Sequence, residues 1–164
     1  MKTKLFLLLA IAISALFLGS ATAAATPSSG GFKSTVLAKG ALAKPTEIEG
    51  LGIHFATERP TDIYVQQVDF PGHATSGWHQ HPGLVLATVK TGTITFHFGC
   101  RVKSFSAGQT FVEAPLEVGL AENLSDTPAQ VLAAFVIQSG QAPRLDAAAP
   151  VCNGEGDQGE QGSN

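Results

Sequence analysis

Charge is scarce in this chain of 164 residues, and neither sign of charge is concentrated in a cluster. Only 14% of the residues are charged, and 13 acidic residues slightly outnumber 10 lysines and arginines. A protein that binds nucleic acid through its phosphates presents a basic patch, so we expect no nucleic-acid partner. The low charge, with 18 glycines and 9 prolines, also excludes a coiled coil and a collagen and favours one β-rich domain.

Several motifs that mark catalytic chemistry are missing as well. The chain has no nucleophile elbow, no phosphate-binding loop, no Rossmann glycine pattern and no HExxH sequence. We therefore expect neither a nucleotide nor a flavin cofactor. No paired-carboxylate motif indicates glycoside hydrolysis, so motifs alone assign no catalytic residue.

One long apolar run is present, and it lies at the N-terminus. Residues 1–23 have the pattern of a secretory signal peptide: two lysines precede an apolar stretch over residues 5–18, and a small-x-small cleavage site ends at Ala23. The stretch is shorter than the roughly 20 residues that span a bilayer, and no second run of that length follows. We expect cleavage after Ala23 and a secreted or periplasmic protein with no membrane span after cleavage.

The chain has only two cysteines, Cys100 and Cys152. An exported protein meets an oxidising compartment, where a pair of cysteines tends to form a disulfide. Chain-entropy arithmetic for the loop that this bond closes gives about 4 kcal/mol of stabilisation. Two free thiols, or thiols that hold a metal, are the alternatives; of the histidines, only His97 lies close to Cys100 in the sequence. We expect the disulfide.

Small and polar segments flank the part of the chain that can fold. The composition of residues 24–31 indicates a flexible lead-in. Residues 153–164 contain four glycines, three acidic residues and no apolar residue, so this tail cannot bury enough surface to become ordered. We expect one folded domain over residues 32–152.

Short apolar runs separated by turn residues predict that this domain is all-β. The runs recur at intervals of about 8–12 residues, which is typical of a sandwich or a barrel, and helical periodicity is hard to find. Turn residues such as Gly92 and Gly108 separate the runs. We expect strands at residues 32–42, 62–70, 84–89, 93–98, 101–105, 110–113, 118–121 and 131–138.

His79 and His81 stand two residues apart. In an extended strand, residues i and i+2 lie on the same face, so both imidazoles can bind one divalent metal ion if other residues supply further ligands. Two surface histidines in a turn would show the same pattern. The pair alone is therefore a weak signal.

The sequence around this pair resembles the cupin superfamily. The first cupin motif contains a His-x-His pair and ends on a glycine, and here the two histidines and Gly92 are in frame. The second motif begins with a glycine and ends with an asparagine, which Gly108 and Asn123 match. The resemblance covers residues 62–138 and implies a cupin-type double-stranded β-helix, a jelly-roll-like antiparallel barrel with any site in its mouth.

Both motifs depart from the family at the metal ligands. Val85 stands where the first motif has glutamate, and Gly119 stands where the second has histidine. Of the four family ligands, only His79 and His81 remain. If the protein is an enzyme, the resemblance implies metal-dependent dioxygenase or isomerase chemistry, although one fold hosts many functions.

Two glutamates are candidates for a third ligand. Period 2 along a regular strand places Glu117 on the same face as Gly119, beside the position of the missing histidine, so Glu117 is the first candidate. Glu113, at the end of the strand expected over residues 110–113, is the second. Two histidines and one carboxylate suit Fe(II), and Mn, Ni or Zn are the other divalent metals that we expect. The plain alternative is that both glutamates face water.

The remaining histidines have weaker claims. The apolar residues of the strand expected over 93–98 share one face, so His97 on the other face should lie at the surface. His73 should be a solvated loop residue, although it could close over the site. His54 has no assigned role, and Trp78 should pack on the strand face opposite His79.

Three functions remain open at this stage. The first is an exported cupin that binds a divalent metal weakly and has an unknown activity. The second is a metal-free module that holds a small molecule in an apolar barrel cavity; the residues expected to line it are Val85, Leu86, Phe96 and Phe111. The third is a structural barrel that forms a homodimer through a strand edge. The metal content of the mature protein distinguishes the first from the other two.

The composition of the tail makes the first testable prediction. A chain that ends at Cys152 should melt at nearly the same temperature as the full mature chain, because residues 153–164 have no apolar anchor. Thermal denaturation of the two chains measures the difference. A loss of several degrees would show that the tail packs against the domain.

Overall fold

Along the core strands of this protein, buried and more exposed side chains alternate, and continuous apolar runs are less common. The computed structural model describes residues 25–152, which form strands and contain no helix. The expected signal peptide and the expected disordered tail lie outside these described residues. Within them, no helix is present that could cross a membrane.

The described residues form twelve strands. In chain order they are β1 (Lys33–Leu42), β2 (Thr46–Gly50), β3 (Ile53–Thr57), β4 (Thr61–Phe70), β5 (His79–Gln80), β6 (Leu84–Thr91), β7 (Thr93–Phe98), β8 (Arg101–Ser106), β9 (Thr110–Glu113), β10 (Gly119–Glu122), β11 (Ala129–Gln138) and β12 (Leu145–Asp146).

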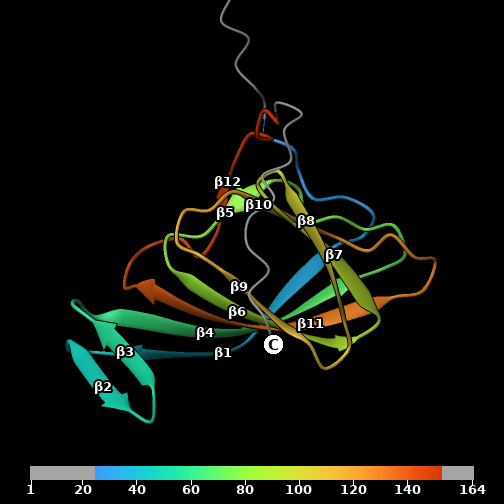
Figure 1. Ribbon diagram of the computed structural model, residues 1–164. Coiled ribbons are helices and arrows are strands. Elements are labelled where there is room, and N and C mark those ends of the chain that lie inside the picture. The colour runs from blue at the N-terminus through green and yellow to red at the C-terminus, as the bar shows by residue number, and fades with distance from the viewer. Residues whose placement is uncertain (1–24, 153–164) are drawn as a thin grey trace, which may run out of the picture.

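Two five-stranded antiparallel sheets make up the barrel. One has the strand order β1-β4-β11-β6-β9 and the other has the order β12-β5-β10-β7-β8. Figure 1 shows the first sheet below the second, with the hairpin of β2 and β3 projecting to one side. The expected all-β class and barrel architecture are therefore confirmed, and every strand expected from the sequence is present within a few residues.

Four strands were not expected from the sequence. β5 and β12 are only two residues long, too short to produce a hydrophobic period. The β2–β3 hairpin turns at Leu51, whose φ is 51°, and Gly52, whose φ is 80°. Tight hairpin turns usually carry Asn or Gly at the first of these positions, so leucine there gives no turn signal.

The inward faces of the two sheets form one apolar core. On β11 and β6 every second residue is buried, which brings Phe135 and Val85 into the interior. Phenylalanines from β7, β8 and β9 add an aromatic cluster, in which Phe96 and Phe111 have ring centroids 4.8 Å apart. The same alternation turns Leu86 outward, where it is 41% exposed, so its expected place in the cavity wall is wrong.

The segment before β1, expected to be a flexible lead-in, pairs with the loop before β5. Ser29 and Thr75 exchange two main-chain hydrogen bonds of 3.0 and 3.2 Å, and the main-chain N–H of Trp78 donates to Thr26 Oγ1 at 3.1 Å. Main-chain groups of both segments need partners wherever water is excluded. The lead-in segment supplies hydrogen-bond partners for Thr75 and Trp78. The composition of the segment alone does not predict this pairing.

Cys100 and Cys152 form the expected disulfide, with their Cα atoms 5.6 Å apart. Cys100 lies in the turn between β7 and β8, and Cys152 is the last residue that the structure describes. The bond therefore ties the last of the described residues to the turn between β7 and β8. This confirms the pairing and agrees with an extracytoplasmic location.

Removal of the disulfide makes the second prediction. The double substitution Cys100→Ser/Cys152→Ser should lower the free energy of unfolding by about 4 kcal/mol, since the unfolded chain regains the freedom that the closed loop denies it. Denaturant titration of the oxidised wild type and of the variant measures the loss. Unreduced wild type should show no free thiol under denaturing conditions, and two titratable thiols per chain would contradict the pairing.

Candidate metal centre

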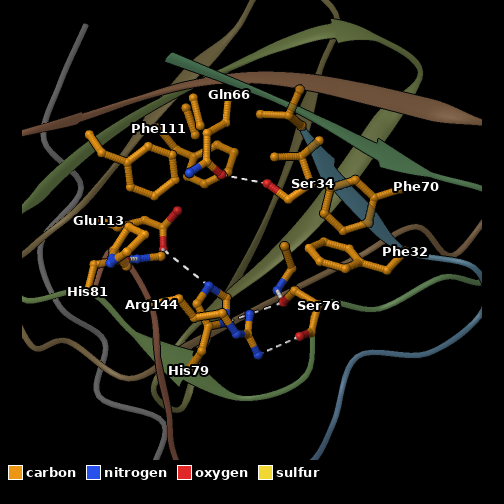
Figure 2. Close-up of a pocket in the computed structure, with 17 residues that line it drawn as sticks. Phe32, Ser34, Gln66, Phe70, Ser76, His79, His81, Phe111, Glu113 and Arg144 are labelled. Carbon is orange, nitrogen blue, oxygen red and sulfur yellow. Dashed lines mark hydrogen bonds and ion pairs between the residues drawn. The ribbon is translucent and has the colours of Figure 1, made fainter. Parts of the chain in front are cut away.

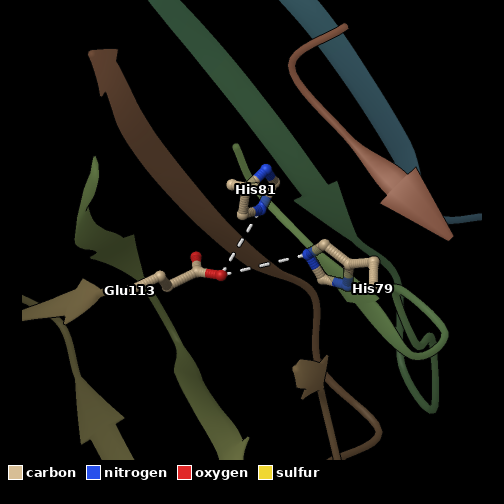
Figure 3. A group of neighbouring side chains, drawn as sticks. All are labelled: His79, His81 and Glu113. Carbon is tan, nitrogen blue, oxygen red and sulfur yellow. Dashed lines mark ion pairs between the residues drawn. The ribbon is translucent and has the colours of Figure 1, made fainter. Parts of the chain in front are cut away.

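Three side chains from two sheets converge inside the barrel: His79, His81 and Glu113 (Figure 3). Their ligand atoms all lie within 4.8 Å of one another. The carboxylate oxygen Oε2 of Glu113 is 4.0 Å from Nε2 of His79 and 3.4 Å from Nε2 of His81. All three side chains are buried, so the cluster is shielded from bulk water.

Strand geometry explains why these residues meet. His79 begins β5, which lies between β10 and β12 in its sheet, and His81 follows directly after the strand. On β9 the inward positions are Phe111 and Glu113. The period of 2 that buries Phe111 in the aromatic cluster therefore also carries the carboxyl group of Glu113 into the barrel.

The loop before β5 depends on a glycine. Gly77 has a φ of 68°, and a Cβ atom there would lie 2.1 Å from the carbonyl oxygen of Thr26. Any other residue would therefore displace the lead-in segment or the loop. The close approach leaves the carbonyl of Gly77 directed at the imidazole of His79.

Main-chain carbonyls fix both imidazoles. Nδ1 of His79 donates to the Gly77 carbonyl at 2.8 Å, and Nδ1 of His81 donates to the carbonyl of Pro143. Because a carbonyl only accepts, each neutral ring carries its hydrogen on Nδ1 and a bare lone pair on Nε2. Histidines that bind metals are oriented in this way by the partner of their second nitrogen.

Burial keeps His79 neutral. Loss of hydration, and after it the positive charge of Arg144 and the neighbouring His81, together lower the pKa of its imidazole from 6.5 to about 3. A neutral imidazole is the form that binds a metal ion. His79 therefore offers its Nε2 lone pair over the whole physiological pH range.

The donor set fits a divalent metal ion. Two ligand atoms that each lie about 2.1 Å from one ion can be at most about 4.2 Å apart. The two separations between the histidines and Glu113, 4.0 and 3.4 Å, lie below this limit. The largest separation in the cluster, 4.8 Å, exceeds it, so the two imidazoles must move closer together by a few tenths of an ångström to hold one ion. Two imidazoles and one carboxylate are also a donor set that transition metals accept, with further positions left open.

Glu117, the first candidate for the third ligand, does not join the histidines. A turn at Leu116, whose φ is 60°, precedes it, and the regular strand begins only at Gly119. The period-2 argument therefore fails, because it assumed an extended chain between Glu117 and Gly119. Glu117 lies instead 3.4 Å from the guanidinium of Arg101 on a partly exposed surface, and the second candidate, Glu113, takes the place in the cluster.

Two positions where the chain lacks the metal ligands of the cupin motifs lie opposite residues of the cluster on neighbouring strands. Val85, which stands at the family's glutamate position, pairs directly with Glu113 on the neighbouring strand. Gly119, which stands at the family's histidine position, pairs with His79. A Cβ atom at Gly119 would lie 2.5 Å from the ring of Phe96, so Phe96 occupies the space that a fourth ligand would need.

A cavity of about 280 Å³ opens beside the cluster (Figure 2). Its walls are mostly apolar. His79, His81, Glu113 and Arg144 gather at one end, and Ser34 and Gln66 form a second polar pair away from them. Of the four residues expected to line it, only Phe111 does so; Val85 and Phe96 are buried in the core away from it.

The other histidines lie outside the cluster. On β7, His97 contacts Glu122 at 2.7 Å and stacks edge-on against Trp78; its side chain is half-buried rather than at the surface. His73 is an exposed loop residue beside Asp126, and His54 lies on the exposed β2–β3 hairpin.

Two residues of the site were missed by the sequence reasoning. Pro143 orients His81, and the guanidinium of Arg144 donates to the carbonyl of Ser76 at 2.8 Å. Both come from the loop after β11, more than 60 residues beyond the histidines in the chain. No spacing or period connects segments that far apart.

Comparison with known proteins supports the fold. No family model matches the chain, and no curated protein matches its sequence. An uncharacterised protein with a double-stranded β-helix domain from Klebsiella pneumoniae is 21% identical, with 75% of this chain and 90% of that chain covered at a TM-score of 0.52. A cupin-like protein from Thermotoga maritima is 19% identical over 53% of this chain and 65% of that one, with a TM-score of 0.47.

The strand order, the antiparallel pairing and the likeness to the Klebsiella protein together define the class. The chain has a double-stranded β-helix fold. This confirms the fold that the resemblance around the His-x-His pair implied.

The lowered pKa of His79 predicts a pH-dependent stability. The unfolded imidazole titrates near 6.5 and the folded one at about 3, so the unfolded state binds the extra proton between these values. The contribution of His79 to the free energy of unfolding is therefore fully present above pH 6.5. It decreases as the pH falls from 6.5 towards 3, by up to about 1.4 kcal/mol per pH unit. His79→Gln should remove this component.

Denaturant titration of the metal-free protein between pH 7 and pH 4 measures the effect. The stability difference between wild type and His79→Gln should shrink as the pH falls, whereas exposed His54→Gln should show no such trend. Parallel curves for wild type and His79→Gln would contradict the burial of a neutral imidazole.

Proposed function

We propose that this protein is an exported cupin that binds a divalent metal ion through His79, His81 and Glu113. One observation carries the proposal: Nε2 of each histidine and Oε2 of Glu113 face one another, while the ring hydrogens point away to main-chain carbonyls. Three electron-pair donors thus face one small space. If Glu113 were protonated, its one hydrogen could pair with only one of the two imidazole nitrogens. A cation, which all three donors can contact, is therefore the natural occupant.

Three protein ligands leave open positions on a bound ion. Such a site binds water or a further ligand, and the ion supplies a Lewis acid there. Fe(II), Mn(II), Ni(II) and Zn(II) are the metals that the donor set accepts. Because Phe96 excludes a fourth protein ligand at Gly119, we expect weaker binding than in a complete four-ligand site.

Two features support the proposal of export. The disulfide between Cys100 and Cys152 is typical of oxidising compartments. The signal-peptide pattern of residues 1–23 predicts the same location. The mature protein should therefore meet its metal in the periplasm or outside the cell.

Calorimetric titration of the metal-free protein with Mn(II), Ni(II) and Zn(II), and with Fe(II) under anaerobic conditions, tests the site. Wild type should bind one ion per chain at neutral pH. His79→Gln, His81→Gln and Glu113→Gln should each weaken binding by at least about a hundredfold, since loss of a partner outside the coordination sphere already costs 10- to 100-fold. Glu117→Gln, the matched glutamate control, should bind as wild type does.

Two results would overturn this assignment. Absence of saturable binding by wild type would favour the alternative function, a metal-free cupin module that holds a small molecule in its cavity. Loss of binding in Glu117→Gln with retention in Glu113→Gln would return the third ligand to the turn before β10.

A further inference from the structure

Arg144 places a positive charge at the polar end of the cavity (Figure 2). Its Nη2 donates to the carbonyl of Ser76 at 2.8 Å, and its Nε donates to Asp146 at 2.9 Å. A guanidinium has five N–H groups, so these two bonds hold its plane in position and leave other donors free. The side chain is 29% exposed, which places it between the cavity and solvent.

The formal charges around the cavity depend on the metal ion. Glu113 and Asp146 carry two negative charges against the single positive charge of Arg144, so the metal-free cavity is negative on balance. A divalent ion bound to Glu113 reverses the sign to net positive. Because Glu113 is buried and Asp146 is 61% exposed, solvent screens the latter more strongly, which favours the reversal further.

The rest of the cavity wall is mostly apolar, apart from the hydrogen-bonded side chains of Ser34 and Gln66. Val68, Phe70, Phe111 and Phe135 line it from three strands. At the packing density of protein interiors, a volume of about 280 Å³ accommodates on the order of ten non-hydrogen atoms. The wall therefore suits an aromatic or branched hydrocarbon body of that size, with its polar group at the end where Arg144 lies.

From these observations we propose that the metal-loaded cavity binds small monocarboxylic acids that carry an apolar body. The proposal rests on the proposed metal site. The carboxylate is held by the ion and by the free N–H groups of Arg144, and the hydrocarbon part packs against the phenylalanines. Planar guanidinium groups recognise carboxylates in pairs of parallel hydrogen bonds, which gives Arg144 a role that a lysine fulfils less well.

Because the bound ion changes the net charge around the cavity from negative to positive, binding of the acid and binding of the metal must be coupled. The acid should bind the loaded protein and not the metal-free protein. Linkage requires the converse as well: a bound acid raises the affinity for the metal by the same factor.

Calorimetry with 3-phenylpropanoate as the probe tests the proposal, after the metal stoichiometry has been measured on the same protein. The loaded protein should bind this acid at least about tenfold more tightly than its uncharged amide, and more tightly than acetate, which lacks the apolar body. The metal-free protein should not prefer the acid to the amide.

Substitutions of Arg144, with Arg101 as the control, test whether Arg144 contacts the carboxylate of the acid. Arg144→Gln should weaken binding of the acid to the metal-loaded protein by about tenfold or more. Metal affinity is measured on the same variant, because Arg144 also ties the loop of Pro143 to Ser76. Arg144→Lys should restore part of the loss, and Arg101→Gln, the matched control on the outer surface beside Glu117, should change nothing.

The outcomes separate this proposal from the proposed function. Failure to bind metal overturns the metal site itself and leaves the acid without its anchor. Metal binding with equal affinity for acid and amide, or with an Arg144→Gln variant that binds the acid as wild type does, overturns the inference about the acid and leaves the metal site intact.

Discussion

The site depends above all on two hydrogen bonds to the main chain. The carbonyls of Gly77 and Pro143 accept the Nδ1 hydrogens of His79 and His81, and so both Nε2 lone pairs turn towards Glu113. Neither carbonyl belongs to a regular ladder; each lies in a loop whose path other segments hold. The lead-in packs beneath Gly77, and Arg144 ties the loop after β11 to Ser76. Chemistry at the centre of the barrel is thus set by loops at its mouth.

The fold could be predicted from the sequence because its signals are local. Eight strands of the barrel have an apolar period or a bounding turn that the chain itself displays, and the His-x-His pair with Gly92, Gly108 and Asn123 indicated the superfamily. Asn123 illustrates why such a residue matters to the fold: its buried amide donates to the carbonyls of Phe70, Pro71 and Thr127. It closes a corner between strands and takes no part in the metal cluster.

The site could be predicted only in part, because its completion depends on register between distant strands. The histidine pair follows from spacing two residues apart, but the position of the third member of the cluster, Glu113, follows from its pairing with Val85 on the neighbouring strand. The preference for Glu117 assumed an extended chain where a turn at Leu116 interrupts it. Pro143 and Arg144 gave no signal at all, since only the folded barrel brings their loop to the histidines. The sequence thus named all three side chains of the cluster as candidates, preferred the wrong glutamate, and gave no indication of Pro143 and Arg144.

The orientation of the two imidazoles is the claim from which the metal site and its ligand preference both follow. Histidine side-chain nitrogen NMR of the metal-free protein at neutral pH measures it directly, because the two tautomers give distinct nitrogen shifts. His79 and His81 should carry their hydrogens on Nδ1, and Zn(II) should shift their Nε2 resonances while those of His54, His73 and His97 stay in place. Hydrogens on Nε2 of His79 and His81, or Zn(II) shifts confined to the other histidines, would contradict this claim.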